Sequence, residues 1–209
     1  MKPNFQVDLL AITPDCEKLI EEAGRTCYLS FGKIGKGSEK KFIKMLIKSG
    51  HLSVLEHAYA TFRIKGGSRA FTHQLVRHRI CSFSQQSQRY VSEKEFDFIT
   101  PHSIRKNSEA LKLFNETMEL LKENYQKLQA MGIKNEDARF VLPNAIKSEI
   151  VISANLREWR YILQLRCAPD AQWEIRGICN EILKILKKEA PVVFEDFELD
   201  GDKKVAIVK

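Results

Sequence analysis

The sequence lacks long hydrophobic runs and paired cysteines. It contains nothing close to the roughly 20 uncharged apolar residues of a membrane-spanning helix. Its five cysteines are odd in number and none is spaced C-x-x-C, so neither a disulfide framework nor a zinc site is indicated. The apolar run near the N-terminus is broken by Asp8 and ended by Pro14, which makes it too short for a signal peptide. We therefore expect a protein of the reducing cytoplasm.

The glycine-rich nucleotide motifs are also missing. There is no G-x-G-x-x-G turn, no G-x-x-x-x-G-K-[ST] loop and no G-x-S-x-G elbow. A ligand that carries phosphate would therefore have to be held by side chains. Without the G-x-S-x-G elbow, the serines lack the sequence context of a hydrolase nucleophile.

The composition is that of a soluble globular chain with a basic bias. Of 209 residues, 44% are hydrophobic and 29% are charged, which suits one domain with a real core. The formal net charge of +7 favours anionic partners, such as nucleotides, phosphorylated cofactors or nucleic acid.

Helical and strand patterns are mixed along the chain without strict alternation. We predict strands over 5–12, 59–65, 96–99 and 147–154, and helices over 14–27, 38–49, 68–77, 111–131, 135–142, 156–165 and 171–189. Gly66 and Gly67 are expected to end the second strand, residues 78–90 to form an ordered loop, and Asp170 to cap the last helix. The fold class is then α+β: a single domain, 1–209, with mixed helices around a central, mainly antiparallel twisted sheet.

The segment 77–90 is the most unusual part of the chain. It contains three arginines, one histidine, three serines and three glutamines, and no glycine, proline, aspartate or asparagine. Arginine forks match phosphate or carboxylate oxygens, and glutamine and serine can read the edge of a base. The alternative is a solvated basic loop. Cys81, inside the segment, is interpreted as a small buried thiol.

Two further clusters have ordinary structural alternatives. The stretch 51–57 holds His51 and His57, but Ser53 and Glu56 within it fit a capping box, so the alternative is simply a capped helical turn. The stretch 155–166 places Arg157 and Tyr161 on one helical face, and is equally a surface helix with basic side chains. The histidine spacings do not match H-E-x-x-H, so no metal site is predicted.

Four ordered motifs carry a resemblance to a known family. The triplet Arg77-His78-Arg79, followed by Ser87 and Arg89-Tyr90, resembles the signature of flavin-dependent thymidylate synthase. The stretch 51–57 is similar to that family's G-H-x-[ST]-x-x-E-H element, residues 139–143 to its A-R-x-x-L-P element, and residues 155–175 to its N-x-R…L-R…A-Q-W-E-I tail. Together these motifs cover roughly residues 30–175.

The resemblance implies an activity and a set of ligands. The reaction would be reductive methylation of dUMP to dTMP in de novo dTMP biosynthesis. Methylenetetrahydrofolate would donate the carbon, and FAD, reduced by NADPH, would carry the hydride. The resemblance also implies a homotetramer whose active sites are shared between subunits, with no nucleic acid or membrane as partner.

Residue roles follow position by position from the resemblance. The catalytic residues would be Arg166, which polarises the uracil ring, and His51 on the flavin and folate side. The FAD-binding residues would be Ser53, Arg77, His78, Arg79, Gln85, Asn155, Arg157 and Tyr161. The dUMP-binding residues would be Gln74, Arg77, Gln85, Gln86, Ser87, Gln88, Arg89, Arg139 and Arg166. Tyr161 stands where asparagine or histidine is common, and Gln85 replaces an acidic residue of some relatives.

A nucleic-acid-binding module is the competing hypothesis. The basic loop and its aromatic neighbours would suit it, although no RRM, KH or helix-turn-helix pattern is present. The two hypotheses differ in a simple observation: a flavoprotein is yellow, whereas a binding module is colourless and depends steeply on salt.

Overall fold

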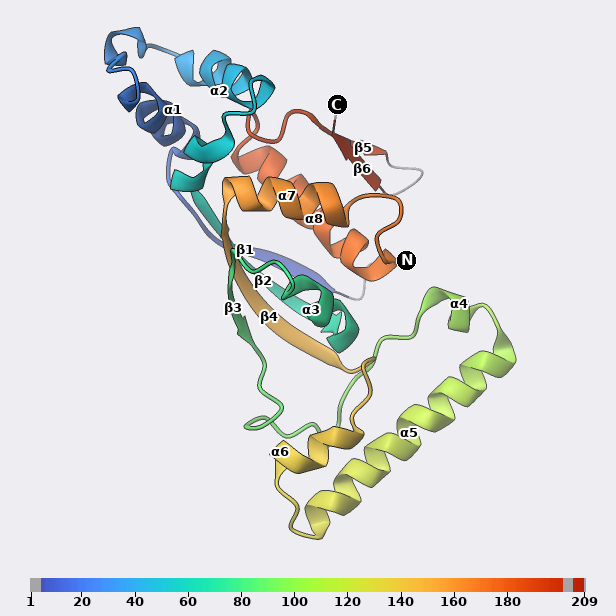
Figure 1. Ribbon diagram of the computed structural model, residues 1–209. Helices are drawn as coiled ribbons and strands as arrows, with labels where there is room; N and C mark the ends of the chain where they lie inside the picture. Colours follow the sequence, from blue (N-terminus) through green and yellow to red (C-terminus); the bar gives the residue numbers. More distant parts are fainter. Residues whose placement is uncertain (1–4, 201–204, 209) are drawn as a thin grey trace. The chain divides into compact units, whose positions relative to one another are not determined.

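The computed structural model describes residues 5–200 and 205–208, with side chains for 5–200 (Figure 1). The chain divides into two compact units. The first comprises Met1–Gln6, Ile64–Leu75 and Ser84–Ile150, and the second comprises Val7–Arg63, Val76–Phe83 and Val151–Lys209.

The elements confirm the predicted α+β class. The strands are β1 (Gln6–Ile12), β2 (Tyr59–Ser68), β3 (Ser82–Gln85), β4 (Lys147–Asn155), β5 (Phe197–Asp200) and β6 (Val205–Val208). The α-helices are α1 (Cys16–Thr26), α2 (Ser38–Lys48), α3 (Arg69–Leu75), α4 (His102–Arg105), α5 (Ser108–Ala130), α6 (Asn135–Ala138), α7 (Leu156–Arg166) and α8 (Trp173–Glu189). Short 3-10 turns are η1 (Phe31–Lys33), η2 (Leu52–His57) and η3 (Arg139–Val141).

Four of the strands form the antiparallel sheet, in the order β1-β2-β4-β3, and β5 pairs with β6 in a separate antiparallel ribbon. Buried and less buried residues alternate along most of β2 and β4, as a sheet with one covered face requires. All four strands of this sheet have residues in both units. That residues 1–209 form one catalytic domain stays a prediction.

In the second unit, α7 is anchored by its aromatic residue. Trp159 is fully buried, its ring meets that of Phe62 edge-on at 5.1 Å, and its indole N–H donates to the Ala60 carbonyl at 3.0 Å. Leu156, Ile162 and Leu163 of the same helix are also fully buried. Helix α8 lies beside α7 (Figure 1). Helix α7 therefore has one face buried in the core of the second unit.

Helices α1 and α2 of the second unit pack closely because of a glycine. A Cβ added at Gly24 would come within 2.6 Å of the Phe42 ring, so only glycine allows this approach. The Arg25 guanidinium covers the same ring at 4.3 Å and bonds to the buried Glu21 carboxylate at 2.7 Å.

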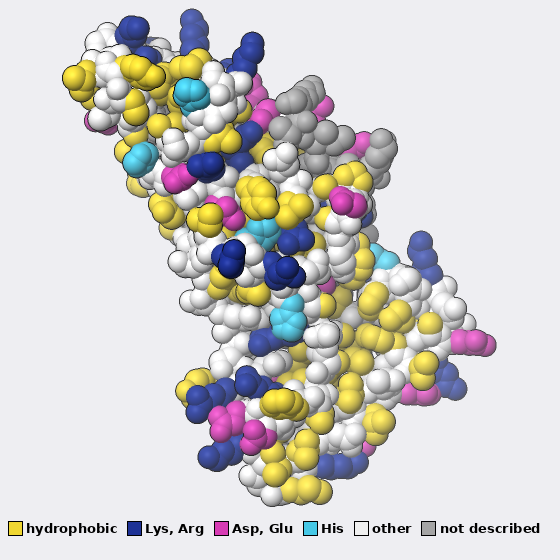
Figure 2. All heavy atoms as spheres, viewed as in Figure 1, with side chains coloured by type: hydrophobic (Ala, Val, Ile, Leu, Met, Phe, Trp, Pro, Cys, Tyr) yellow, Lys and Arg dark blue, Asp and Glu magenta, His cyan; other side chains and the backbone are white. Residues whose placement is uncertain are grey.

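In the first unit, α5 is the longest helix and packs against α6 and η3. Asn107 caps it by accepting from the Ala110 N–H at 3.0 Å. Only two of its side chains, Met118 and Tyr125, are buried. Figure 2 shows hydrophobic side chains along α5 and around the turn to α6. The exposed hydrophobic residues of this part of the chain are Leu113, Leu120, Met131, Ile133 and, in η3, Phe140.

Several local predictions were wrong. Strand β2 does not stop at Gly66 but runs through both glycines to Ser68, with Gly66 at φ 75. The segment 78–90 is not all loop, since it contains β3. Residues 96–99 form no strand, and within the described chain Phe98 makes only an isolated bridge to Ile146.

The cap of α8 was also misassigned. Gln172, not Asp170, caps this helix, with its Oε1 accepting from the N–H groups of Glu174 and Ile175. A glutamine can cap in this way because its longer side chain folds back onto the first turn, which a preference for aspartate does not reveal.

Two leucines on α7 test the role of this helix in stability. Leu163 is fully buried and Leu165 is 44% exposed. We expect Leu163→Ala to lower the free energy of unfolding by about 2–5 kcal/mol, because it removes transfer free energy and leaves a cavity. Leu165→Ala is the matched control and should cost less than about 1 kcal/mol. Urea denaturation measures both, and equal losses would contradict the packing described here.

Candidate active site

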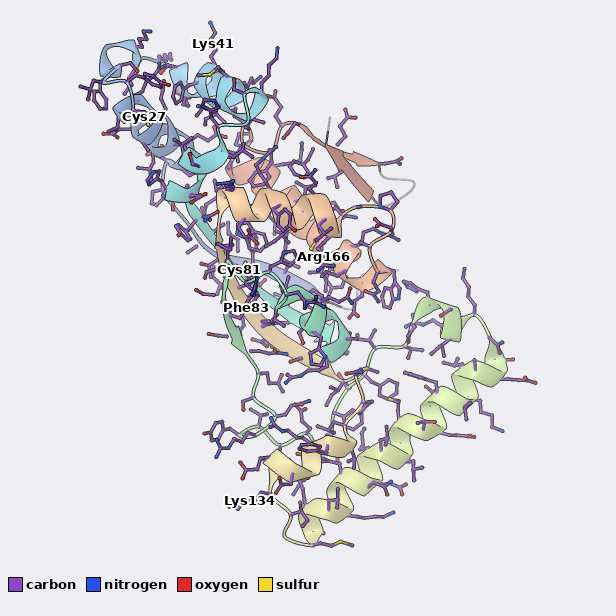
Figure 3. All side chains as sticks on the ribbon, in the orientation of Figure 1. Cys27, Lys41, Cys81, Phe83, Lys134 and Arg166 are labelled. Atoms are coloured by element: carbon purple, nitrogen blue, oxygen red, sulfur yellow. The ribbon has the colours of Figure 1, made fainter. Side chains whose placement is uncertain are left out.

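A buried histidine and an arginine meet in the second unit. His78 is 4% exposed and its Nε2 accepts a hydrogen bond from Arg166 Nε at 3.0 Å. Arg166 is the last residue of α7, and Figure 3 labels it together with Cys81, which follows His78 by three residues. This bond holds the Nε–H of the Arg166 guanidinium and so restricts the orientation of the planar group.

The surroundings of His78 keep it neutral. Burial, and next the Arg166 guanidinium, lower its pKa from 6.5 to about 4. On its other side the carboxylate of Glu158 lies 3.7 Å from Nδ1, and the Tyr161 ring packs edge-on at 5.9 Å between centroids. We call His78, Glu158, Tyr161 and Arg166 the His78 cluster; three of its four members lie on α7.

The N-terminal end of α7 packs against η2 in the same unit. Asn155 is buried, and its Oδ1 caps the helix by accepting from the Glu158 N–H at 2.8 Å. Arg157 is exposed and pairs with Glu56 of η2 at 2.5 Å. Glu56 therefore does not close a capping box with Ser53, as the sequence suggested; Ser53 and His51 are exposed on this turn.

Arg77 and Arg79 differ from the other candidate arginines. Both are exposed, on either side of the buried His78. Among the residues that the structure describes, no carboxylate pairs with either of them, whereas Arg157 and Arg89 each have one. Two exposed guanidiniums without a carboxylate partner in the described chain remain available to an anionic ligand.

In the first unit, polar contacts hold the last residue of β3 and the residue that follows it. Gln85 donates from Nε2 to the Thr72 hydroxyl at 2.8 Å, and Gln86 donates to the buried Glu93 carboxylate at 3.0 Å. Arg69 reaches the Gln86 carbonyl at 3.3 Å. The polar loop is therefore built into the unit rather than solvated along its length.

Two of the arginines expected to bind dUMP contact the short helix α6. Arg89 lies at the end of the polar loop, and Arg139 lies in η3. Arg89 pairs with the Glu136 carboxylate of α6 at 2.6 Å, and Arg139 donates from Nε to the Glu136 carbonyl at 3.0 Å. The Ser87 hydroxyl accepts from the Arg89 N–H at 3.2 Å, and Gln88 is 8% exposed.

Gln74 lies on α3, and its Nε2 donates to the Ala70 carbonyl at 3.2 Å. The predicted residues thus fall into two groups. The first unit holds Gln74, Gln85, Gln86, Ser87, Gln88, Arg89 and Arg139, and the second holds His51, Ser53, Arg77, His78, Arg79, Asn155, Arg157, Tyr161 and Arg166.

Sequence reasoning missed the acidic and basic residues that support these groups. They are Glu158 beside His78, Glu136 beside Arg89, and Arg69 and Glu93 beside Gln86. Nothing in their local spacing marks them, because each partner is brought close by the fold. Burial raises the pKa of both Glu93 and Glu158, as is common at functional sites.

The described residues contain no cluster that could hold a metal ion and no helix that could cross a membrane. No group of three or more metal-binding side chains occurs there. No helix there is both long and apolar enough to cross a membrane.

The ionisation of His78 predicts how stability depends on pH. Its pKa is about 4 in the folded chain and 6.5 as an ordinary value, so the unfolded chain binds more protons between these limits. The stability that the neutral, buried His78 allows is complete above pH 6.5. As the pH falls toward 4, the free energy of unfolding decreases with a slope approaching about 1.4 kcal/mol per pH unit. We expect this slope in the difference between the wild type and His78→Gln, measured by urea unfolding from pH 4 to 7. Parallel stability curves for the two proteins would show that His78 titrates normally.

A family model and two relatives of similar sequence point to one kind of enzyme. The family model described as Thymidylate synthase complementing protein matches residues 8–192. The flavin-dependent thymidylate synthase of Geobacter sulfurreducens is 42% identical over 92% of this chain and 86% of its own length. That of Nitratidesulfovibrio vulgaris is 41% identical over 90% of this chain and 85% of its own.

A solved structure is similar in fold. The crystal structure of Thymidylate Synthase X from Helicobacter pylori, with FAD and dUMP, superposes with a TM-score of 0.77 and 30% identity. The match covers 92% of this chain and 98% of that one. With a family model over most of its length and relatives above 40% identity, the chain belongs to the flavin-dependent thymidylate synthase family and is an enzyme.

Proposed function

We propose that this enzyme makes dTMP by reductive methylation of dUMP. Methylenetetrahydrofolate donates the carbon, and FAD, reduced by NADPH, supplies the hydride. The observation that carries the proposal is the charged Arg166 oriented by a buried, neutral His78, in a chain whose relatives bear this enzyme's name. The solved relative with FAD and dUMP supports the choice of these two ligands.

Arg166 activates the uracil ring in this proposal. C5 of neutral dUMP is a poor nucleophile, and an enzyme can activate it either by adding a thiolate to C6 or by drawing electron density to the N3–O4 or O2 edge. Burial raises the pKa of Cys81 and of Cys167 to about 12, so neither thiol supplies a thiolate near neutral pH. A guanidinium against the ring edge stabilises the anionic ring instead.

Arg77 and Arg79 hold the FAD diphosphate, supported by their exposure and their lack of a carboxylate partner among the described residues. Ser53, Asn155, Arg157 and Tyr161 complete the flavin contacts, and His51 lines the flavin and folate side. Asn155 also caps α7, so its substitution disturbs the helix as well as any ligand contact.

The first unit supplies further dUMP contacts besides Arg166. Arg89 and Arg139 converge on α6 and offer two positive charges to the phosphate. Ser87, Gln88 and the neighbouring glutamines supply directional hydrogen bonds, and Gln74 contributes from α3. Glu136 serves as the counter-charge of Arg89 until the phosphate takes its place.

The assembly is a cytoplasmic homotetramer with active sites shared between subunits. The exposed apolar side chains of α5 and the turn after it give the first unit a surface that a second copy of the chain can cover (Figure 2). All five cysteines are free, which agrees with a reducing compartment.

The reaction itself is tested with purified protein. We expect a yellow protein that forms dTMP from dUMP when methylenetetrahydrofolate, NADPH and FAD are all present. Omitting methylenetetrahydrofolate or NADPH should stop dTMP formation. Omitting FAD should also stop it in protein whose bound flavin has been removed. Protein that forms no dTMP under the complete conditions would contradict the proposal.

Removing Arg166 should strongly lower turnover without unfolding the protein. We expect Arg166→Ala to lower dTMP formation by about 10²–10³-fold, because a preorganised donor at developing charge is lost. Cys81→Ala, measured in the same assay, should keep its activity because the thiol has no chemical role. An Arg166→Ala protein with normal turnover, or a covalent adduct of dUMP with Cys81 seen by mass spectrometry, would overturn the assignment.

Removing Arg79 should weaken flavin binding. A charge-assisted contact contributes about 1.5–3 kcal/mol, so Arg79→Ala should raise the Kd for FAD by about tenfold or more. Arg105→Ala removes another exposed arginine, on α4, and is the control. Flavin fluorescence titration measures both; an unchanged Kd in Arg79→Ala would remove this residue from the flavin site.

A further inference from the structure

The protonation pattern of His78 is set by its two neighbours. Arg166 Nε carries a hydrogen and can only donate, so His78 Nε2 must present a lone pair to accept the 3.0 Å bond. His78 is neutral near pH 7, and its single proton therefore resides on Nδ1. A histidine with the opposite tautomer would direct an N–H at the Arg166 N–H and break the contact.

Glu158 is the acidic group on the Nδ1 side. Its Oε1 lies 3.7 Å from Nδ1, an electrostatic contact that favours a hydrogen on that nitrogen over one on Nε2. The position of Glu158 is defined, since its own N–H is held by the cap residue Asn155 at 2.8 Å. Its side chain is 10% exposed, so solvent screens this contact little.

We propose that Glu158 is a positioning residue: it holds His78 in the tautomer with hydrogen on Nδ1, and His78 thereby orients the Arg166 guanidinium for the ring of dUMP. The proposal rests on the proposed function for its catalytic consequence, but not for the tautomer itself. It assigns a function to a residue whose local spacing in the sequence does not mark it.

The other charged and titratable groups near this arrangement do not supply the same effect. Arg157 acts on Glu158, lowering its pKa against the raising effect of burial, and so helps to keep the carboxylate ionised. Burial, and next the Glu158 carboxylate, raise the pKa of the Cys81 thiol, which therefore remains a neutral group. The Tyr161 ring meets the imidazole edge-on and leaves the choice of tautomer to Glu158 and Arg166.

The tautomer can be measured without any turnover. In wild-type protein labelled with ¹⁵N-histidine, we expect the His78 nitrogen shifts to report hydrogen on Nδ1 at pH 7, with the signal assigned by its loss in His78→Gln. Glu158→Gln should shift the population toward hydrogen on Nε2, because the carboxylate charge is gone and the amide can donate to Nδ1. Glu158→Asp, which keeps the charge, should retain the wild-type tautomer.

Turnover should follow the tautomer. We expect Glu158→Gln to lower kcat by about 10- to 100-fold, by analogy with the loss seen when the partner that orients a metal-binding histidine is removed. Flavin content should be unchanged, and Glu158→Asp should recover kcat to within a few-fold of wild type. Glu21→Gln is the matched control: it also removes a buried carboxylate of the second unit, one bonded to Arg25 and Ser38, and should keep both kcat and the tautomer.

The outcomes separate the two claims. An unchanged tautomer in Glu158→Gln overturns the proposal whatever the turnover, and a changed tautomer with normal kcat shows that Glu158 does not act through Arg166. A wild-type protein that makes no dTMP defeats the proposed function and the catalytic part of this proposal, while the nitrogen shifts still decide the tautomer.

Discussion

The arrangement of α7 and His78 depends on one buried contact. This contact is the hydrogen bond from the Trp159 indole to the Ala60 carbonyl. It joins α7 to β2 inside the core, where an unpaired indole N–H or carbonyl would cost about 1–3 kcal/mol. Because this bond and the burial of Trp159 hold α7 against β2, the helix presents its neighbouring residues in defined directions. Glu158 and Arg166 therefore face His78 from one rigid helix rather than from a loop.

The distribution of arginine partners separates structural from functional positive charge. Arg160 is buried and bonded to both carboxylate oxygens of Asp196, so it is a structural ion pair. Arg89 has an acidic partner but is more than half exposed, which allows a phosphate to compete for it. Arg77 and Arg79 are exposed and have no such partner in the described chain. The net charge of the sequence cannot make this distinction.

Burial also decides which groups can react. It lowers the pKa of His78 and raises that of the nearby Cys81, so the site contains a neutral imidazole and a protonated thiol near pH 7. A permanently charged guanidinium is then the group suited to stabilise negative charge on a substrate. This division of roles is the physical basis of the proposed reaction, in which no cysteine acts as a nucleophile.

The sequence by itself determined the α+β class, the family and the residues of the signature, because these depend on local periodicity and on motifs that are contiguous in the chain. It located Arg166 at the end of a helix and His78 between two arginines. It did not show that β2 continues through Gly66, that Gln172 caps α8, or that Glu158 faces His78. Each of these is set by contacts between segments far apart in the chain or by a single side-chain geometry. Protonation states, such as that of His78, were decided by the tertiary structure alone, because burial and the nearest charge do not exist until the chain has folded.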